Sequence, residues 1–169
     1  MPVDLADTTI RPATTADAEA VSRIYNHYVS DTVVTFEEEP LSAATIDGRM
    51  QEVAAAGLPW LVAEQDGRVA GYAYASPWRS RSAYRFSAEV TVYLDPARLR
   101  RGLGSRLYDA LFPLLQRRGL HALMGVISLP NQASVALHER FGMQKIGHLA
   151  EVGFKFDRWI DVGYWQRLL

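Results

Sequence analysis

The sequence predicts an α/β fold of the α+β kind, in which a central mixed, mostly antiparallel sheet of about seven strands is flanked by about four helices. Two observations carry this prediction. Strand-like apolar stretches follow one another directly toward the middle of the chain, and strands alternate with helices in its second half. The length of 169 residues suits one domain, so we expect a tail over residues 1–7 and a single domain over residues 8–169.

The first half of the chain is expected to begin with a short strand and two helices and to continue into three strands. Val21, Ile24 and Tyr28 recur at helical spacing in the first helix, and Gly57 marks the end of the second. The sequence Gln65-Asp66-Gly67-Arg68 separates two apolar runs and is a strong signal for a tight hairpin. The expected elements are a strand at 8–12, helices at 17–29 and 42–56, and strands at 60–64, 69–75 and 84–94.

The second half is expected to alternate helices and strands before it closes with two strands. Its first helix follows a glycine-containing turn directly and ends before Gly119. Asn131 is suited to cap the next helix, and Gly142 is suited to end it. The expected elements are a helix from the glycines to about residue 118, a strand at 120–128, a helix at 131–141, and strands at 143–150 and 158–167.

The composition limits the classes of function. A formal net charge of −1 argues against general nucleic-acid binding, which needs an excess of basic residues. The chain has no cysteine, and its four histidines are scattered without ligand spacing, so we expect neither a disulfide nor a metal site. We see no signal peptide and no stretch of the roughly 18 apolar residues that a membrane span needs. We therefore expect no membrane contact and a cytoplasmic location.

The strongest functional signal is the turn Leu99-Arg100-Arg101-Gly102-Leu103-Gly104, which joins the strand at 84–94 to a helix. The N-terminus of such a helix offers unpaired N–H groups to a phosphate, and the arginines add positive charge. The turn lacks the lysine of a Walker P-loop, and Leu107 stands where a Rossmann fingerprint has its third glycine. The third interpretation is a turn that binds the pyrophosphate of coenzyme A.

With this turn, and with Asn131 followed by Ser134 and His138, residues 8–169 resemble the GNAT N-acetyltransferases. In that family a Gln/Arg-x-x-Gly-x-Gly/Ala turn wraps the pyrophosphate; Leu99 departs from the pattern and removes one polar contact. The resemblance implies acetyl-CoA as co-substrate and no metal. It assigns cofactor binding to Val92, Tyr93, Leu94, Arg100, Arg101, Gly102, Leu103, Gly104, Ser105 and Asn131.

Within the family, the chain is most similar to the phosphinothricin and methionine sulfoximine acetyltransferases. This similarity implies direct acetyl transfer to the α-amino group of a small amino-acid-like substrate, a reaction associated with detoxification and herbicide resistance. It also implies a homodimer. Phe156 departs from members that carry a polar residue at its position. The segments that carry the similarity are 26–28, 77–84, 88–93, 129–131, 137–139, 153–155 and 159–165.

The resemblance also assigns the residues of the chemistry. Glu89 matches the general base, and its apolar strand neighbours favour the raised pKa that this role needs. His138 stands at the family position near the cofactor sulfur, where a tyrosine often acts as general acid; acid, base and structural roles stay open. Two arginines two residues apart suit an anionic substrate. The expected substrate-binding residues are Phe36, Arg79, Arg81 and Tyr84.

The backbone N–H groups of Val92 to Leu94 are expected to bind the thioester carbonyl and the pantetheine amides. This requires a bulge or a splayed strand pair, because a fully paired strand has no free donor. Two alternatives stay open: an acetyltransferase for another amine (a polyamine, an aminoglycoside or a protein N-terminus) and a non-catalytic acyl-CoA-binding module. The paired arginines argue against a cationic amine, whereas Glu89 and His138 argue against the non-catalytic module.

Overall fold

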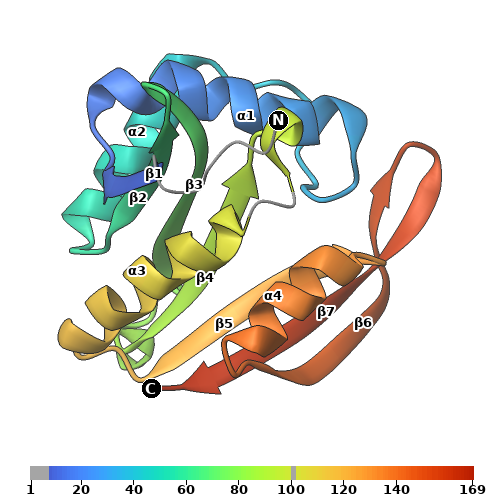
Figure 1. Cartoon of the computed structure of the whole chain (residues 1–169). Helices are drawn as coiled ribbons and strands as arrows, with labels where there is room; N and C mark the ends of the chain where they lie inside the picture. Colours follow the sequence, from blue (N-terminus) through green and yellow to red (C-terminus); the bar gives the residue numbers. More distant parts are fainter. Residues whose placement is uncertain (1–7, 100–101) are drawn as a thin grey trace.

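The computed structural model describes residues 8–99 and 102–169, which form a twisted central sheet with helices on both sides (Figure 1). The expected tail over residues 1–7 lies outside the described residues. The sheet is seven-stranded, and its strands follow the order β1-β2-β3-β4-β5-β7-β6. They are β1 (Thr8–Pro12), β2 (Trp60–Gln65), β3 (Arg68–Pro77), β4 (Ser87–Leu94), β5 (Ala122–Leu129), β6 (Gln144–Lys155) and β7 (Arg158–Leu168).

Neighbouring strands pair antiparallel throughout the sheet except at β4 and β5, which pair in parallel. The parallel pair joins the meander β1 to β4 to the second group formed by β5, β7 and β6. A parallel pair needs a crossover connection, which helix α3 (Leu103–Arg117) supplies between β4 and β5. The predicted fold class, a mixed and mostly antiparallel sheet flanked by helices, is therefore confirmed.

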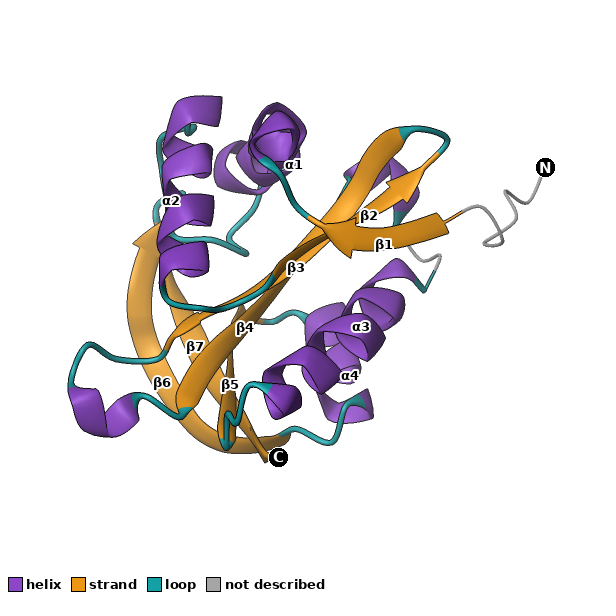
Figure 2. Ribbon diagram, turned by 90° about the vertical axis from the view of Figure 1, so that its left-hand side faces the viewer, coloured by secondary structure: helices purple, strands orange, loops and turns teal. Residues whose placement is uncertain are grey.

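Helices cover both faces of the sheet. The first two, α1 (Ala18–Asp31) and α2 (Ala43–Ala55), pack on one face, whereas α3 and α4 (Gln132–Arg140) lie on the other (Figure 2). Burial of one leucine side chain contributes about 1.5–3 kcal/mol, so the apolar stripe of α3 fixes this helix against the sheet. None of the helices in the described part of the chain is long and apolar enough to cross a membrane. The fully buried leucines of α3 are Leu103, Leu107, Leu111 and Leu115.

Local signals set several element ends where the sequence predicts them. Asp66 and Gly67 have φ angles of 51° and 70°, which is the backbone that a tight two-residue hairpin between β2 and β3 requires. Ser42 and Asn131 each accept a backbone hydrogen bond through the side chain and so cap α2 and α4. These ends are therefore fixed by residues close in sequence.

Two strand bounds differ from the expected ones by more than two residues. β4 begins only at Ser87, because residues 82–84 form a 3₁₀ turn instead of continuing the strand. β6 extends further than expected, to Lys155. Its pairing with β7 shifts after Leu149, and Glu151 has a φ of 51°, so a bulge interrupts the regular alternation. The extension brings the turn between β6 and β7 next to the loop that follows α1 (Figure 1).

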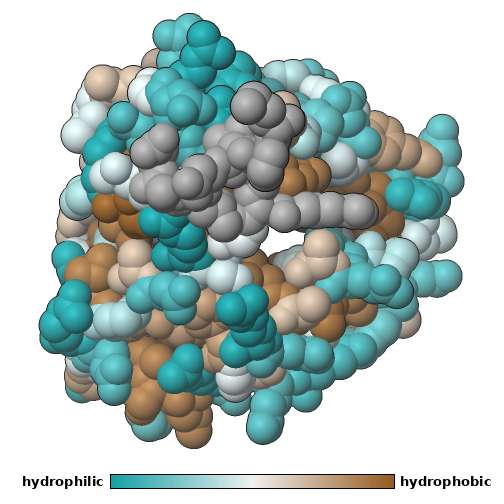
Figure 3. Space-filling view, in the orientation of Figure 1, coloured by the Kyte–Doolittle hydropathy of each residue, from teal (hydrophilic) through white to brown (hydrophobic). Residues whose placement is uncertain are grey.

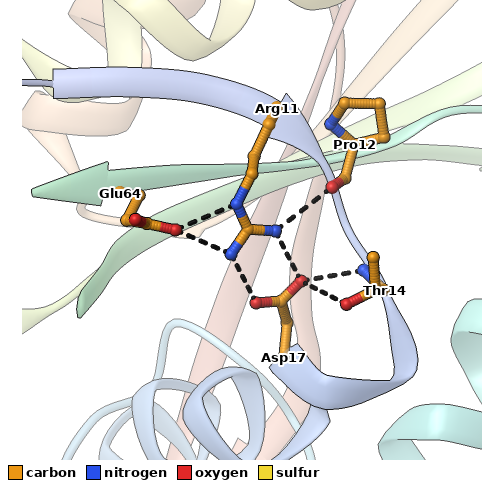
Figure 4. Close-up of polar contacts among 5 residues, drawn as sticks. All are labelled: Arg11, Pro12, Thr14, Asp17 and Glu64. Atoms are coloured by element: carbon orange, nitrogen blue, oxygen red, sulfur yellow. Dashed lines mark hydrogen bonds and ion pairs between the residues drawn. The ribbon is translucent and has the colours of Figure 1, made fainter. Parts of the chain in front are cut away.

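An ion-pair cluster ties β1 and β2 to the start of α1 (Figure 4). Arg11 of β1 donates to both carboxylate oxygens of Asp17 at 2.8 Å, and its Nε donates to Glu64 of β2 at 2.9 Å. Asp17 also accepts from the backbone N–H of Thr14, and its carboxyl is buried. The hydrogen bond from Arg11 holds the pKa of Asp17 below its usual value despite this burial.

Candidate active site

The candidate site lies where β4 and β5 separate. The two strands pair from Ser87 as far as Glu89, which stands opposite Met124, and no later pair joins them among residues 8–99 and 102–169. A hollow of about 220 Å³ opens beyond this last pair, and an opening is visible in this region in the space-filling view (Figure 3). We name it the β4–β5 cleft. Its walls come from β4, β5, β7, α4 and the loop after α1, and they include Phe36, Glu89, Val92, Asn131 and His138.

The backbone of β4 directs donors into the β4–β5 cleft. The N–H of Asp95 donates to Ala70 of β3, and the carbonyl oxygen of Ser87 accepts from Trp78, the residue after β3. The odd-numbered residues of β4 therefore direct their backbone groups toward β3. By alternation, the N–H groups of Val92 and Leu94 point to the β5 side, where the described part of β5 no longer pairs with β4. Tyr93 directs its N–H toward β3. Of the three N–H donors expected at Val92, Tyr93 and Leu94, only those of Val92 and Leu94 therefore point away from β3.

Glu89 lies at the closed end of the β4–β5 cleft. Its side chain is half-buried, and this burial raises its pKa above the usual value, while the positive charge of Arg79 opposes the shift. A carboxylate with a raised pKa is a stronger base than an exposed one. Glu89 therefore has the electrostatic property that a general base requires, and it faces the same space as the backbone donors of β4.

His138 of α4 forms a buried part of the cleft wall, with only 4% of its surface exposed. Its Nδ1 lies 2.7 Å from the carbonyl oxygen of Ser134, so Nδ1 carries the proton and donates it. Its Nε2 is therefore an acceptor and lies 3.1 Å from the hydroxyl of Tyr108. Burial lowers the pKa of His138 below its usual value, although the bond to Ser134 opposes this shift. The ring is neutral at pH 7, and its acceptor nitrogen is already hydrogen-bonded.

Tyr108 is a site residue that the sequence analysis missed. It lies on α3, is fully buried, and packs against Phe112 and Phe141 with ring centroids 5.0 Å and 5.5 Å away. Burial raises the pKa of its hydroxyl well above the usual value, so the hydroxyl keeps its proton and donates it to His138. In the sequence Tyr108 is one apolar position of a helix, 30 residues from His138, and no spacing signal connects the two.

The glycine-containing turn precedes α3 directly. Gly102 has a φ of 68°, a left-handed conformation that favours glycine. A Cβ at Gly104 would lie 3.0 Å from a side chain of α4, so the missing side chain lets the two helices approach closely. Leu103, Gly104 and Ser105 form the first turn of α3, where backbone N–H groups have no acceptor within the helix. The other expected phosphate ligands, Arg100 and Arg101, lie outside the described residues.

The expected substrate residues divide between two places. Phe36, in the loop after α1, lines the β4–β5 cleft together with Glu89. The other three line a neighbouring hollow of about 520 Å³ beside the loop between β3 and β4. The guanidinium carbon of Arg79 lies 5.0 Å from the centre of the Trp78 ring. The positive charge of Arg79 acts to lower the pKa of Glu89. The three residues of the neighbouring hollow are Arg79, Arg81 and Tyr84.

Asn131 combines a structural role with a position in the cleft wall. Its Oδ1 accepts the backbone N–H of Ser134 at 3.1 Å and so caps α4, which leaves its amide nitrogen as the donor for a ligand. In the ranges that the structure describes, no three His, Asp or Glu side chains are grouped so that they could hold a metal ion.

Comparison with known proteins gives consistent matches over most of the chain. The sequence profile of the acetyltransferase (GNAT) domain matches residues 10–163. A phosphinothricin N-acetyltransferase from Streptomyces viridochromogenes is 46% identical over 161 residues, which cover 94% of this chain and 86% of that protein. An L-methionine sulfoximine/L-methionine sulfone acetyltransferase from Salmonella typhimurium is 36% identical, and the match covers 94% of this chain and 92% of that protein.

A solved structure agrees with the sequence matches. The structure is that of a GNAT phosphinothricin acetyltransferase from Sinorhizobium meliloti in complex with acetyl-CoA. It superposes on this chain with a TM-score of 0.93 at 36% identity, and the match covers 96% of this chain and 89% of that one. The arrangement of β4, β5 and the helices around the cleft therefore belongs to a known architecture.

Proposed function

This chain belongs to the GNAT acetyltransferase family, and from this premise we propose that it moves the acetyl group of acetyl-CoA directly to the α-amino group of a small amino-acid-like substrate. The substrate is of the phosphinothricin, methionine sulfoximine or methionine sulfone type, which the names of the similar proteins support. We propose detoxification or herbicide resistance as the purpose of the reaction. The observation that carries the proposal is the β4–β5 cleft, which is lined by one carboxyl of raised pKa and by Val92, whose backbone N–H points to the unpaired side of β4.

The residues of the cleft fit acetyl-CoA. The N–H groups of Val92 and Leu94 suit the thioester carbonyl and the pantetheine amides, and the amide nitrogen of Asn131 suits the same arm. The first turn of α3 after Gly102 suits the pyrophosphate, because its N–H groups and the helix dipole favour negative charge. When bound, acetyl-CoA supplies an activated acetyl group with a thiolate as leaving group.

Glu89 is the proposed general base. An α-amino group is mostly protonated at pH 7 and must lose a proton before it can attack a carbonyl. The carboxylate of Glu89 accepts that proton, directly or through one water, and general-base catalysis of this kind contributes about 10²–10⁴-fold. Direct transfer forms no covalent acetyl-enzyme, which agrees with the absence of a cysteine nucleophile from the chain.

His138 keeps its proposed position at the sulfur end of the cleft, with a role that its hydrogen bonds restrict. A neutral ring whose Nδ1 donates to Ser134 has no proton on Nε2 to give to a leaving thiolate. We therefore assign His138 as a neutral acceptor that is oriented by Tyr108 and forms the wall next to the reacting groups.

The anionic part of the substrate is proposed to bind the arginines. Arg79 already acts on the charge of Glu89, so a carboxylate bound near Arg79 would have its amino group within reach of the cleft. Arg81 and Tyr84 lie in the same hollow as Arg79 and can add further donors. Phe36 lines the β4–β5 cleft with Glu89, where it would contact the aliphatic part of the substrate.

We further propose that the protein is a homodimer. Large apolar side chains are exposed on β6, on β7 and in the turn between them, and apolar surface that gathers on one part of a protein marks association sites. Two of them, Phe154 and Trp159, pack on one another with ring centroids 4.8 Å apart. The exposed residues are Ile146, Leu149, Val152, Phe154, Phe156 and Trp159.

The experiment that tests this function follows the release of free CoA. Wild-type protein with acetyl-CoA should turn over methionine sulfone, methionine sulfoximine or phosphinothricin, and it should turn over polyamines and aminoglycosides much less. Preference for a cationic amine or for a peptide N-terminus would overturn the substrate assignment. Binding of CoA without turnover of any amine would instead favour a non-catalytic acyl-CoA-binding module.

A further inference from the structure

Lys155, at the end of β6, is a buried ammonium group whose donors all go to backbone carbonyls. Its side chain is only 2% exposed. Nζ donates to the carbonyl oxygens of Val29 at 2.7 Å, Thr35 at 2.9 Å and Glu37 at 2.8 Å. An ammonium has three donors, so Lys155 uses its full capacity here. One of the acceptors, Val29, lies in the last turn of α1, where a helix end favours positive charge.

The other two acceptors, Thr35 and Glu37, stand on either side of Phe36. Phe36 and Thr35 line the β4–β5 cleft with Glu89, so the segment 34–37, here named the Phe36 loop, forms one wall of the proposed amine site. The loop carries few regular backbone contacts of its own, because it joins α1 to α2 without secondary structure. Lys155 therefore fixes the main chain of this loop directly before and directly after the residue that borders the site.

Gly153 lies in β6, the strand of Lys155, and has no side chain. The ring of Phe36 occupies the space where a side chain would stand. A Cβ at Gly153 would lie 2.3 Å from two atoms of the Phe36 ring, far below any normal contact. Gly153 and Lys155 are two residues apart in β6 and therefore face the same side of the strand. One side of β6 thus holds the loop backbone through Lys155 and receives the Phe36 ring at Gly153.

The hairpin turn completes this arrangement. Phe156 and Asp157 have φ angles of 52° and 56°, the left-handed backbone of a tight hairpin turn that bulky residues rarely adopt. The Phe156 ring lies 5.1 Å from Nζ of Lys155, within the range of a cation–π contact. Phe156 therefore covers the buried ammonium.

We infer that Lys155 is a positioning residue for the amine substrate: through its hydrogen bonds to Thr35 and Glu37 it holds Phe36 at the β4–β5 cleft and so sets which amines reach Glu89. This inference rests on the proposed function. Lys155 does not touch the reacting groups, and its three hydrogen bonds reach neither the first turn of α3 nor the donors of β4. Its loss should therefore affect the amine and not acetyl-CoA.

The test compares steady-state kinetics of the full-length wild type with Lys155→Met, using methionine sulfone and acetyl-CoA. We expect the KM for the amine to rise about tenfold or more, with the KM for acetyl-CoA within about twofold of wild type. The matched control is Lys145→Met, which removes the other lysine of β6 from an exposed position and should change neither value. An unchanged amine KM in Lys155→Met would overturn the inference.

Gly153→Ala keeps the inference testable if Lys155→Met does not fold, and a double variant adds a second test if Lys155→Met folds. Gly153→Ala retains the ammonium but displaces the Phe36 ring, so it should raise the amine KM in the same way. Phe36→Ala combined with Lys155→Met should cost little more than Phe36→Ala alone, because the two residues act through one contact. Fully additive effects, or no effect of Gly153→Ala on the amine KM, would contradict the inference. Absence of turnover in the wild type would instead contradict the proposed function.

Discussion

Glu89 of β4 forms the last pair with Met124 of β5, and beyond these two residues the strands separate. The separation has two consequences at one place. It exposes the N–H groups of Val92 and Leu94 on the open side of β4, and it puts the carboxyl of Glu89 at the closed end of the same cleft. A continuous parallel sheet would have neither feature, because β5 would occupy these backbone donors.

Replacement of Glu89 by glutamine tests the assignment of the base. The amide has the same shape but cannot accept the proton, so we expect kcat to fall by about 10²–10⁴-fold. Binding of CoA, measured by calorimetry, should stay close to wild type. Turnover undiminished in Glu89→Gln would exclude Glu89 as the base.

The stability of the same variant gives an independent check. Because burial raises the pKa of Glu89, the fold disfavours the charged carboxylate, and Glu89 costs stability as the pH rises through its folded pKa. At pH 7 the free energy of unfolding of Glu89→Gln should therefore equal or exceed that of wild type. A clear loss of stability at pH 7 would indicate that the carboxylate has a structural partner.

The pH dependence of kcat/KM for the amine should reflect the carboxyl group. Glu89 must be ionised to accept a proton, so activity should fall as the pH drops through a pKa above the usual value of 4.5. Arg79 opposes the rise in the pKa of Glu89. In Arg79→Ala the acid limb of the pH profile, where activity falls with falling pH, should therefore move to higher pH. A limb that stays unchanged in Arg79→Ala would contradict the electrostatic link between the two residues.

Charge reversal tests the anion-binding role of the arginines. In Arg79→Glu the KM for an anionic amine should rise by at least about tenfold, since a charge-assisted pair is replaced by repulsion. The KM for acetyl-CoA should change much less. Arg68→Glu, at the exposed hairpin turn between β2 and β3, serves as control with the same change of charge. Equal rises in both KM values would remove Arg79 from the substrate site.

Tyr108→Phe tests the role of His138. The variant removes the only hydroxyl that contacts Nε2 among the described residues, and a buried acceptor without a partner costs about 1–3 kcal/mol of stability. Because His138 is proposed as a wall of the cleft and not as the acid, kcat should fall by less than about tenfold. A loss of kcat as large as that of Glu89→Gln would assign the pair a direct part in proton transfer.

The Asp17 cluster predicts a specific loss of stability in acid. The pKa of Asp17 is lowered in the fold, so its contribution is fully present above the unfolded value of about 3.9 and is lost as the pH falls through the folded pKa. Asp17→Asn should destabilise the protein at pH 7 by about 1–3 kcal/mol in urea unfolding. The difference from wild type should shrink below about pH 4. A difference that is independent of pH would exclude an ionic contribution.

The sequence predicted those parts of the fold that depend on neighbouring residues. Asp66-Gly67 predicts the hairpin between β2 and β3, and Asn131 caps α4, which follows it. The bulge at Glu151 was not predicted, because a positive φ at a glutamate has no local sequence signal. The end of β6 was therefore expected too early, before Lys155.

The candidate site was predicted only in part, for a similar reason. The family resemblance pointed to Glu89 and Phe36, and both line the β4–β5 cleft. The separation of β4 from β5 could not be predicted, because it depends on how two distant strands twist apart. The contact of Tyr108 with His138 likewise joins two helices through the core. Pairwise contacts of this kind leave no periodic pattern in a single sequence.

A crystal structure of the chain with acetyl-CoA tests the central claim most directly. We predict that the thioester carbonyl oxygen lies within about 2.7–3.2 Å of the N–H of Val92 or Leu94, with the acetyl group facing Glu89 across the β4–β5 cleft. An acetyl group bound outside this cleft, or N–H groups of Val92 and Leu94 bonded to protein acceptors, would contradict the account.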